Sequence, residues 1–298
     1  MPDVPLTVND DAAARRAFTL HGRLWQQNRY VYPVVSRRSK GISIGVNLNP
    51  DKVCNFDCIY CSVDRKVPLP GWGVRDVDIG ILREELREMV QLAGSGGIYQ
   101  FDPFDKIPAA LRRVNDVAFS GDGEPTTCPQ FAEAVRVAAD IVEGAGLREA
   151  VKLVLITNAT MFHKPAVREV LAFLDGHRGE IWAKLDAGTE AYYQEVDRSG
   201  VPLRRVVENV TWCCQTRATV IQTLFMRVRG AVPPEGEVDA YVGRLREILE
   251  AGGRIKLVQL YTVARGTTEA YATALSAAEL EGIAEKVRKV NVAVEVYP

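Results

Sequence analysis

Short apolar runs rich in β-branched residues alternate along the chain with segments in which apolar residues recur every three or four positions. The runs occupy residues 42–48, 116–120, 152–157, 180–185, 219–226, 255–263 and 292–297. A segment with helical spacing follows each of the first six runs, and residues 238–249 show the clearest periodicity. The pattern predicts six strand–helix units and a last strand.

Strands that alternate with helices of this length pair in parallel through right-handed crossovers. The α/β candidates are a doubly wound open sheet and a complete or partial β/α barrel, and both bind ligands at the carboxyl ends of the strands. No linker rich in Pro, Gly or Ser divides the chain. We therefore expect a single domain, with residues 41–298 as the α/β core and residues 1–40 as a small helical or irregular cap.

Composition narrows the class of protein only modestly. The 298 residues are 47% apolar and 25% charged, with a net charge of −1, as in an ordinary soluble globular protein without a strong pull toward nucleic acid or membranes. The first residues lack the basic-then-apolar order of a signal peptide, and no apolar run approaches the roughly 18 residues that span a bilayer. We expect a cytoplasmic protein with no membrane association.

Three of the six cysteines fall within eight residues, in the segment "CNFDCIYC", directly after the first predicted strand. Cys54, Cys58 and Cys61 could hold a metal. A zinc site would need a fourth protein ligand. The candidates for it are His21, His163, His177, Cys128, Cys213 and Cys214. A [4Fe–4S] cluster on three thiolates would instead leave one iron open to a ligand from outside the protein.

The Cys-x3-Cys-x2-Cys spacing, with Tyr60 before the last cysteine, resembles the motif of the radical S-adenosylmethionine (SAM) superfamily. The resemblance implies a partial (β/α)6 TIM-like barrel and a [4Fe–4S] cluster on Cys54, Cys58 and Cys61, with SAM on the open iron. It also implies an electron donor of the flavodoxin or ferredoxin type. In this family SAM is cleaved to a 5′-deoxyadenosyl radical, which removes a hydrogen atom from the substrate. Tyr60 is expected to contact the adenine.

The segment "SGDGEPT", residues 120–126, follows the second predicted strand and resembles the Gly-Gly-Glu segment of the same family. The resemblance assigns Gly121, Asp122, Gly123 and Glu124 to SAM binding. The two glycines would let the backbone approach a ligand closely. The Glu124 carboxylate would meet the methionine ammonium of SAM. The alternative is an ordinary turn, since Gly-Asp-Gly is also a turn sequence.

The fourth predicted strand ends in "WAKLDAG". Alternation along a strand puts Lys184 and Asp186 on one face and Leu185 on the other, and Leu185 suits the exterior under a helix. Lys184 and Asp186 should therefore point into the barrel, where a buried ion pair is costly unless it is used. We expect them to be the catalytic residues, with Asp186 also holding SAM.

Other polar residues occupy comparable places on the remaining strands. Asn158, at the tip of the third, resembles a residue that lines the SAM or substrate pocket, although a turn-forming or capping role fits equally well. Gln222 shares a face with its apolar neighbours two positions away and is assigned to cofactor binding. Alternation also turns Gln259 and Tyr261 inward, because the apolar residues between them suit the exterior.

Within the superfamily, residues 40–265 look most like the branch of wyosine-type tRNA-modifying synthetases, which implies a modified nucleoside or tRNA as substrate. Those synthetases bind a second cluster through upstream cysteines, and no cysteine precedes Cys54 here. An activating enzyme of the glycyl-radical type, acting on a protein partner, is an alternative, and the substrate could also be another small molecule. A non-enzymatic alternative is a structural or electron-transfer Fe–S or zinc protein.

Overall fold

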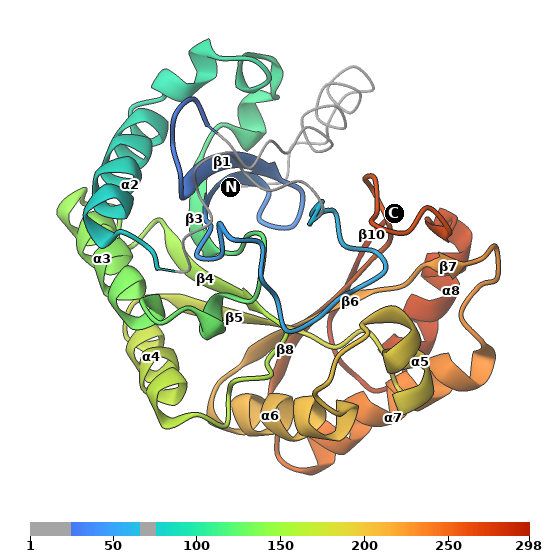
Figure 1. Cartoon of the computed structure of the whole chain (residues 1–298). Helices are drawn as coiled ribbons and strands as arrows, with labels where there is room; N and C mark the ends of the chain where they lie inside the picture. Colours follow the sequence, from blue (N-terminus) through green and yellow to red (C-terminus); the bar gives the residue numbers. More distant parts are fainter. Residues whose placement is uncertain (1–24, 66–75) are drawn as a thin grey trace.

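The computed structural model describes residues 25–65 and 76–298, and eight strands of this part form one curled sheet (Figure 1). The strand order is β1-β2-β3-β4-β5-β6-β8-β10. The strands are β1 (Val31–Ser36), β2 (Gly41–Val46), β3 (Val114–Phe119), β4 (Lys152–Thr157), β5 (Gly179–Lys184), β6 (Thr219–Leu224), β8 (Ile255–Tyr261) and β10 (Val294–Tyr297). The pairs from β2 to β10 are all parallel. This order confirms the predicted partial (β/α)6 barrel.

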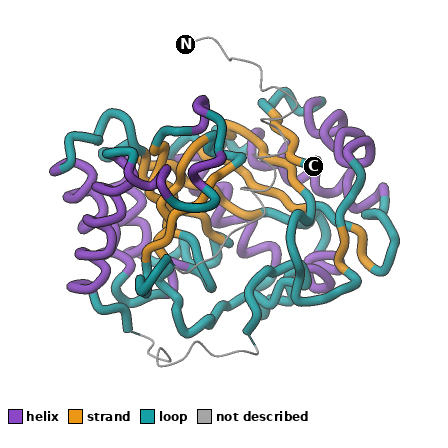
Figure 2. The backbone as a smooth tube through the Cα atoms, turned by 90° about the horizontal axis from the view of Figure 1, so that it is seen from above, coloured by secondary structure: helices purple, strands orange, loops and turns teal. Residues whose placement is uncertain are grey.

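Helices cover the outer side of the sheet, as Figure 2 shows from above. They are α2 (Ile79–Gly94), α3 (Phe131–Gly144), α4 (Pro165–Asp175), α5 (Glu190–Val196), α6 (Leu203–Thr216), α7 (Glu235–Glu250) and α8 (Ala277–Arg288). Short 3₁₀ helices occupy Gly97–Gln100, Phe104–Lys106, Ala109–Leu111 and Pro125–Thr127, and β7 (Arg227–Val228) pairs with β9 (Ala272–Thr273). Val238, Val242 and Leu245 form part of the buried face of α7, as their spacing predicts. No described helix is long and apolar enough to cross a membrane.

The amino-terminal end of the described chain differs from the expected cap. Residues 31–36 form the edge strand β1, which pairs antiparallel with β2 from Val31↔Val46 to Ser36↔Gly41. The Glu85 carboxylate of α2 accepts hydrogen bonds from the amides of Arg29, Tyr30 and Val31, at 2.6–3.1 Å, and so fixes the start of the strand. Pro33 obscures this strand in the sequence, since proline is tolerated only where no ladder donor is needed. Residues 1–24 of the expected cap lie outside the described residues.

The inner face of the sheet carries its own small apolar layer, separate from the large core between sheet and helices. Its buried members are Ala118, Val154, Trp182 and Val220. Strand register puts Lys184 and Gln222 side by side one step toward the carboxyl ends, beyond the Trp182↔Val220 pair. The lumen therefore changes from apolar to polar toward the edge at which parallel barrels place their sites.

Candidate active site

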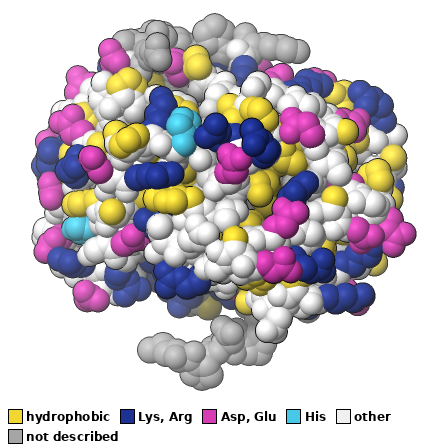
Figure 3. All heavy atoms as spheres, turned by 90° about the horizontal axis from the view of Figure 1, so that it is seen from below, with side chains coloured by type: hydrophobic (Ala, Val, Ile, Leu, Met, Phe, Trp, Pro, Cys, Tyr) yellow, Lys and Arg dark blue, Asp and Glu magenta, His cyan; other side chains and the backbone are white. Residues whose placement is uncertain are grey.

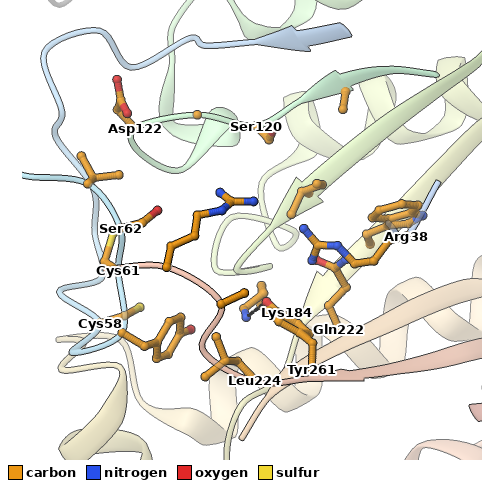
Figure 4. A pocket seen from close by; sticks show the side chains of 18 of the residues that line it. Arg38, Cys58, Cys61, Ser62, Ser120, Asp122, Lys184, Gln222, Leu224 and Tyr261 are labelled. Atoms are coloured by element: carbon orange, nitrogen blue, oxygen red, sulfur yellow. Dashed lines mark hydrogen bonds between the residues drawn. The ribbon is translucent and has the colours of Figure 1, made fainter. Parts of the chain in front are cut away.

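A cavity of about 360 Å³ opens at the carboxyl ends of the strands (Figure 4). The cysteine loop, the 120–124 segment, the ends of β4, β5, β6 and β8, and residues 263–266 contribute to its wall. Its volume lies within the usual range for small-molecule sites. Sequence elements that are far apart in the chain thus meet around one space.

Backbone hydrogen bonds hold the cysteine loop on two sides. The Ile59 amide donates to the carbonyl of Val196, at the end of α5, over 2.9 Å. On the other side the Thr268 amide donates to the Cys61 carbonyl over 2.8 Å, and the Thr268 hydroxyl donates to the Cys58 carbonyl over 3.1 Å. The loop is therefore positioned by a helix end and by the segment after β8, neither of which adjoins it in sequence.

The three cysteines are partly exposed free thiols, and all of them line the cavity. The Arg65 guanidinium donates to Cys61 Sγ over 3.7 Å, and the Phe56 amide donates to Cys54 Sγ over 3.5 Å. Burial raises the pKa of the Cys54 thiol, and burial together with Asp197 raises that of Cys58 well above its ordinary value. Soft thiolate ligands beside N–H donors fit an Fe–S cluster, whose sulfurs such donors stabilise.

The other ligands that a zinc site would need do not reach this cavity. The described candidates that lie elsewhere are Cys128, His163, His177, Cys213 and Cys214. His21 falls outside the described residues. Nor do any three His, Cys, Asp or Glu side chains of the described chain converge closely enough to hold a metal ion. A cluster takes one thiolate per iron, so its ligands need not meet at a point.

Residues 121–123 pack against Asn47 and Val53, which lie between β2 and the first cysteine. A Cβ atom on Gly121 would lie 2.3 Å from Asn47 Oδ1, and one on Gly123 would lie 2.1 Å from the Val53 carbonyl oxygen. Asp122 accepts from Asn47 Nδ2 over 2.7 Å, and its amide donates to Asn47 Oδ1 over 3.1 Å. The two glycines thus let this segment approach the end of β2 and the residues before Cys54, while both also line the cavity, and their contact with SAM stays a prediction.

Glu124 is buried and forms the link between the 120–124 segment and β4. Its Oε1 accepts from the Thr126 amide and hydroxyl, at 3.1 and 2.5 Å, and from the Thr157 hydroxyl at 2.7 Å. Its Oε2 accepts from the Asn158 amide over 2.7 Å. Burial raises the pKa of Glu124, although these bonds oppose the shift. The capacity left for a ligand ammonium therefore lies on Oε2.

Asn158 lines the cavity and also anchors the cysteine loop. Its Nδ2 donates to Asn55 Oδ1 over 2.7 Å. Its Oδ1 accepts from the amide and hydroxyl of Thr160, at 3.1 and 2.7 Å. Asn55 Nδ2 in turn donates to Thr160 Oγ1 over 2.7 Å. The side chain of Asn158 thus forms a local turn with Thr160 at the cavity wall, well before α4 begins at Pro165, and its contact with SAM or substrate stays a prediction.

Lys184 and Asp186 form a buried ion pair at the end of β5, with 3.0 Å between Nζ and Oδ1. The Tyr60 hydroxyl donates to Asp186 Oδ2 over 2.6 Å, and the Leu224 amide donates to Oδ1 over 2.7 Å. Lys184 lines the cavity and also donates to the Tyr261 hydroxyl. Burial disfavours the ammonium, but Asp186 and Tyr261 outweigh it and raise the pKa of Lys184. Lys184 is therefore a fixed cation.

Asp197, at the end of α5, completes this network and was not singled out from the sequence. Its Oδ1 lies 3.1 Å from the Tyr60 hydroxyl. Burial, followed by the nearby charge of Asp186, raises the pKa of Asp197 well above its usual range. Because its place depends on how α5 packs under the cysteine loop, no local sequence pattern marks it.

Gln222 is fully buried on the inner face of β6, as alternation predicts. Its Nε2 donates to Gln259 Oε1 over 2.7 Å, while its own Oε1 has no hydrogen-bond partner among the described residues. Gln222 and Tyr261 line the cavity, and Gln259 lies beside Gln222 in the same register. An unpaired buried acceptor here is a free recognition element at the cavity wall.

Comparisons with known proteins agree with this site. The sequence profile of the Radical SAM superfamily matches residues 48–230. A UPF0026 protein of Helicobacter pylori is 26% identical over 144 residues, which are 48% of this chain and 39% of that protein, so the match spans less than half the relative's length. A radical SAM methyltransferase from Sphaerobacter thermophilus matches with a TM-score of 0.58 at 14% identity, over 90% of this chain and 69% of the other.

The structure of Streptococcus suis SuiB bound to S-adenosylmethionine matches with a TM-score of 0.55 at 14% identity, over 87% of this chain and 52% of that one. At such identity the two structures establish the fold. The profile covers more than half of the chain, including all three cysteines and the 120–124 segment. The superfamily uses a [4Fe–4S] cluster and SAM as its cofactors. The chain belongs to the radical SAM superfamily of enzymes.

Proposed function

We propose that this enzyme binds one [4Fe–4S] cluster through Cys54, Cys58 and Cys61 and uses SAM to remove a hydrogen atom from a substrate held in the barrel lumen. The observation that carries the proposal is that three thiols lie together on the wall of the cavity. Among the described residues, no fourth cysteine and no histidine lines it. When bound, the cluster and SAM supply a 5′-deoxyadenosyl radical by one-electron cleavage of the sulfonium.

The protein's share in this proposal is to hold ligands and exclude water. Glu124 Oε2 is available to the SAM ammonium, beside the thiols. Lys184 serves as a cation that binds a negatively charged group, because its raised pKa makes it unsuited to act as a base. Asp186 acts through Lys184 and Tyr60, since the bonds to these two residues and to the Leu224 amide engage both of its oxygens.

The resemblance to the wyosine-type branch supports a nucleoside or tRNA substrate, and a flavodoxin- or ferredoxin-type protein would donate the electron. Basic and acidic side chains are interspersed on the face that carries α4, α6 and α7 (Figure 3). That face lacks the continuous basic stripe of a large nucleic-acid footprint among its described residues, so recognition would fall to the cavity.

Anaerobic reconstitution tests the proposal. The purified protein is loaded with iron and sulfide, reduced with dithionite and given SAM, and 5′-deoxyadenosine is measured by chromatography. We expect product from the wild type, loss of both cluster and product in Cys58→Ala, and retention of both in Cys213→Ala, a buried cysteine on α6 away from the cavity. A fully loaded wild-type protein that cleaves no SAM would refute the radical function and favour a structural or electron-transfer role.

A further inference from the structure

Arg38, just beyond β1, faces the cavity from the side opposite the cysteines. Its guanidinium carbon lies 4.9 Å from the ring centroid of Tyr261 and 5.9 Å from that of Trp182. Figure 4 shows Arg38 at the far side of the cavity from Cys58 and Cys61. The two aromatic rings belong to β8 and β5, so the barrel wall itself holds this guanidinium.

The donors of Arg38 remain unused by the protein. Within residues 25–65 and 76–298, no carboxylate or carbonyl accepts a hydrogen bond from its guanidinium, which lies over the two rings and near the Tyr297 side chain. The neighbouring Arg37 differs, because its Nη1 donates to the Pro298 carbonyl over 2.8 Å. A guanidinium presents five N–H donors in a planar fork that matches carboxylate and phosphate oxygens. Cation–π contact with the two rings holds the guanidinium at the cavity wall before a ligand arrives.

A second unused polar atom lies on the same wall. Gln222 Oε1 is buried without a partner, and Gln222 pairs in register with Lys184, whose Nζ lies 4.7 Å from the Tyr261 ring centroid. In Figure 4, Lys184, Gln222 and Tyr261 lie between Arg38 and the cysteines. The fork of donors and the lone acceptor therefore face the part of the cavity away from the cluster ligands.

Cationic side chains outnumber carboxylates on the cavity wall, although the net charge of the chain is −1. The cationic residues that line it are Arg37, Arg38, Arg65, Lys184 and Arg265, and the carboxylates that line it are Asp116, Asp122 and Glu124. Asp116 accepts from the Ser43 hydroxyl, and burial raises its pKa to about 6. Asp186 behind the wall balances Lys184, so the cationic side chains that remain exceed these carboxylates by one, and this small excess favours anionic ligands.

We propose that Arg38 binds an oxyanion group of the substrate, a carboxylate or a phosphate, and that Gln222 Oε1 accepts a hydrogen bond from an N–H or O–H group beside it. The inference rests on the proposed function and adds the substrate class to it. The substrate would lie with its anionic end on Arg38 and its reacting carbon toward the cysteines.

Anion titration of the cluster-loaded protein, without reductant, tests the assignment. Inorganic phosphate and acetate are titrated separately at constant ionic strength, and binding is followed by calorimetry. We expect saturable binding of at least one anion, weakened at least tenfold in Arg38→Gln and less in Arg38→Lys, which keeps the charge but loses the fork. Arg204→Gln, an 84% exposed arginine on α6, should bind like the wild type. Binding of phosphate alone would identify a phosphate ester, and binding of acetate alone a carboxylate.

Two results would overturn the proposal. One is anion binding that is absent, or unchanged in both Arg38 variants. The other is anion binding that saturating SAM abolishes, because Arg38 would then belong to the SAM site. Failure of the radical function is separate: it would appear as a wild type that cleaves no SAM while it still binds the anion through Arg38.

Discussion

Gly123 offers a steric test of how the cysteine loop is positioned. An alanine Cβ at this position would lie 2.1 Å from the Val53 carbonyl oxygen and 2.8 Å from Asn49 Cβ. Neither atom is the end of a flexible side chain, so the backbone must give way by roughly 1 Å to reach ordinary contact, as in other overpacked sites. Val53 directly precedes Cys54, and the displacement is therefore passed to a thiol of the site.

Overpacking of this kind costs about 1–3 kcal/mol of unfolding free energy. For a chain of this size that cost lowers the melting temperature by ~2–6 °C. Gly243→Ala is the matched control, because nothing lies within 4 Å of its added Cβ in the middle of α7. Replacing a glycine by alanine inside a helix stabilises it by about 1 kcal/mol. The same chemical change should thus have opposite signs at the two positions.

The assay combines thermal unfolding under nitrogen with the iron bound per chain after reconstitution. Gly123→Ala should melt lower and bind less iron, whereas Gly243→Ala should melt slightly higher and bind as much as the wild type. If Gly123→Ala keeps both its melting temperature and its iron, the contact between the 120–124 segment and the residues before Cys54 does not position the thiol, and the reasoning is wrong.

Three further changes test other parts of the structure. Asp186→Asn removes the carboxylate that is paired with Lys184 and should lower the free energy of unfolding, measured in urea, by about 3–5 kcal/mol. The control Asp239→Asn, whose ion pair is exposed, should lower it by less than ~1 kcal/mol. Asp116→Asn tests a raised pKa: the folded value is about 6 against an ordinary 3.8, so ionisation costs the wild type stability as pH rises from 4 through 6. The free energy of unfolding of the variant should match that of the wild type at pH 4 and exceed it by on the order of 3 kcal/mol above pH 7. Equal urea midpoints for the two proteins above pH 7 would contradict this. Arg198→Ala removes partly exposed ion pairs with Asp57 and Glu269 and should cost less than about 1 kcal/mol, an effect that vanishes in 1 M salt.

The regular part of the fold could be read from the sequence because each element there has a local cause. Strands buried on both faces give short apolar runs, and helices covering them bury one stripe, so the predicted run 152–157 coincides with β4. Alternation also turned Lys184 and Tyr261 inward correctly, since the side-chain period of a strand is two. These inferences need no knowledge of distant contacts.

The parts that sequence reasoning missed depend on contacts between distant segments. Arg38 lies in the basic segment Arg37-Arg38-Ser39-Lys40, which in the sequence is typical of solvated surface, and the structure places this segment in the connection between β1 and β2, with Arg38 at the cavity wall. Asp197 reaches Tyr60 because α5 packs beneath the cysteine loop. Gly121 and Gly123 line the cavity, as their assignment to SAM binding requires, but their close contacts with Asn47 and Val53 join segments that no local motif connects, and their contact with SAM stays a prediction.

The two sides of the cavity differ in how completely the protein satisfies its own polar groups. Beside the cysteines, Glu124 and Asp186 accept hydrogen bonds from surrounding amides and hydroxyls, which fixes the loop that carries the thiols. On the far side, Arg38 and Gln222 keep a donor fork and an acceptor that no described residue uses. A buried polar group left unpaired costs about 1–3 kcal/mol, and the unpaired Gln222 Oε1 belongs to a residue of the cavity wall, where a donor on a ligand can offset that cost. Specificity for the substrate should therefore reside in Gln222 and Arg38, because a molecule without the matching groups leaves the buried Gln222 oxygen unpaired and gains no ion pair with the partly exposed Arg38.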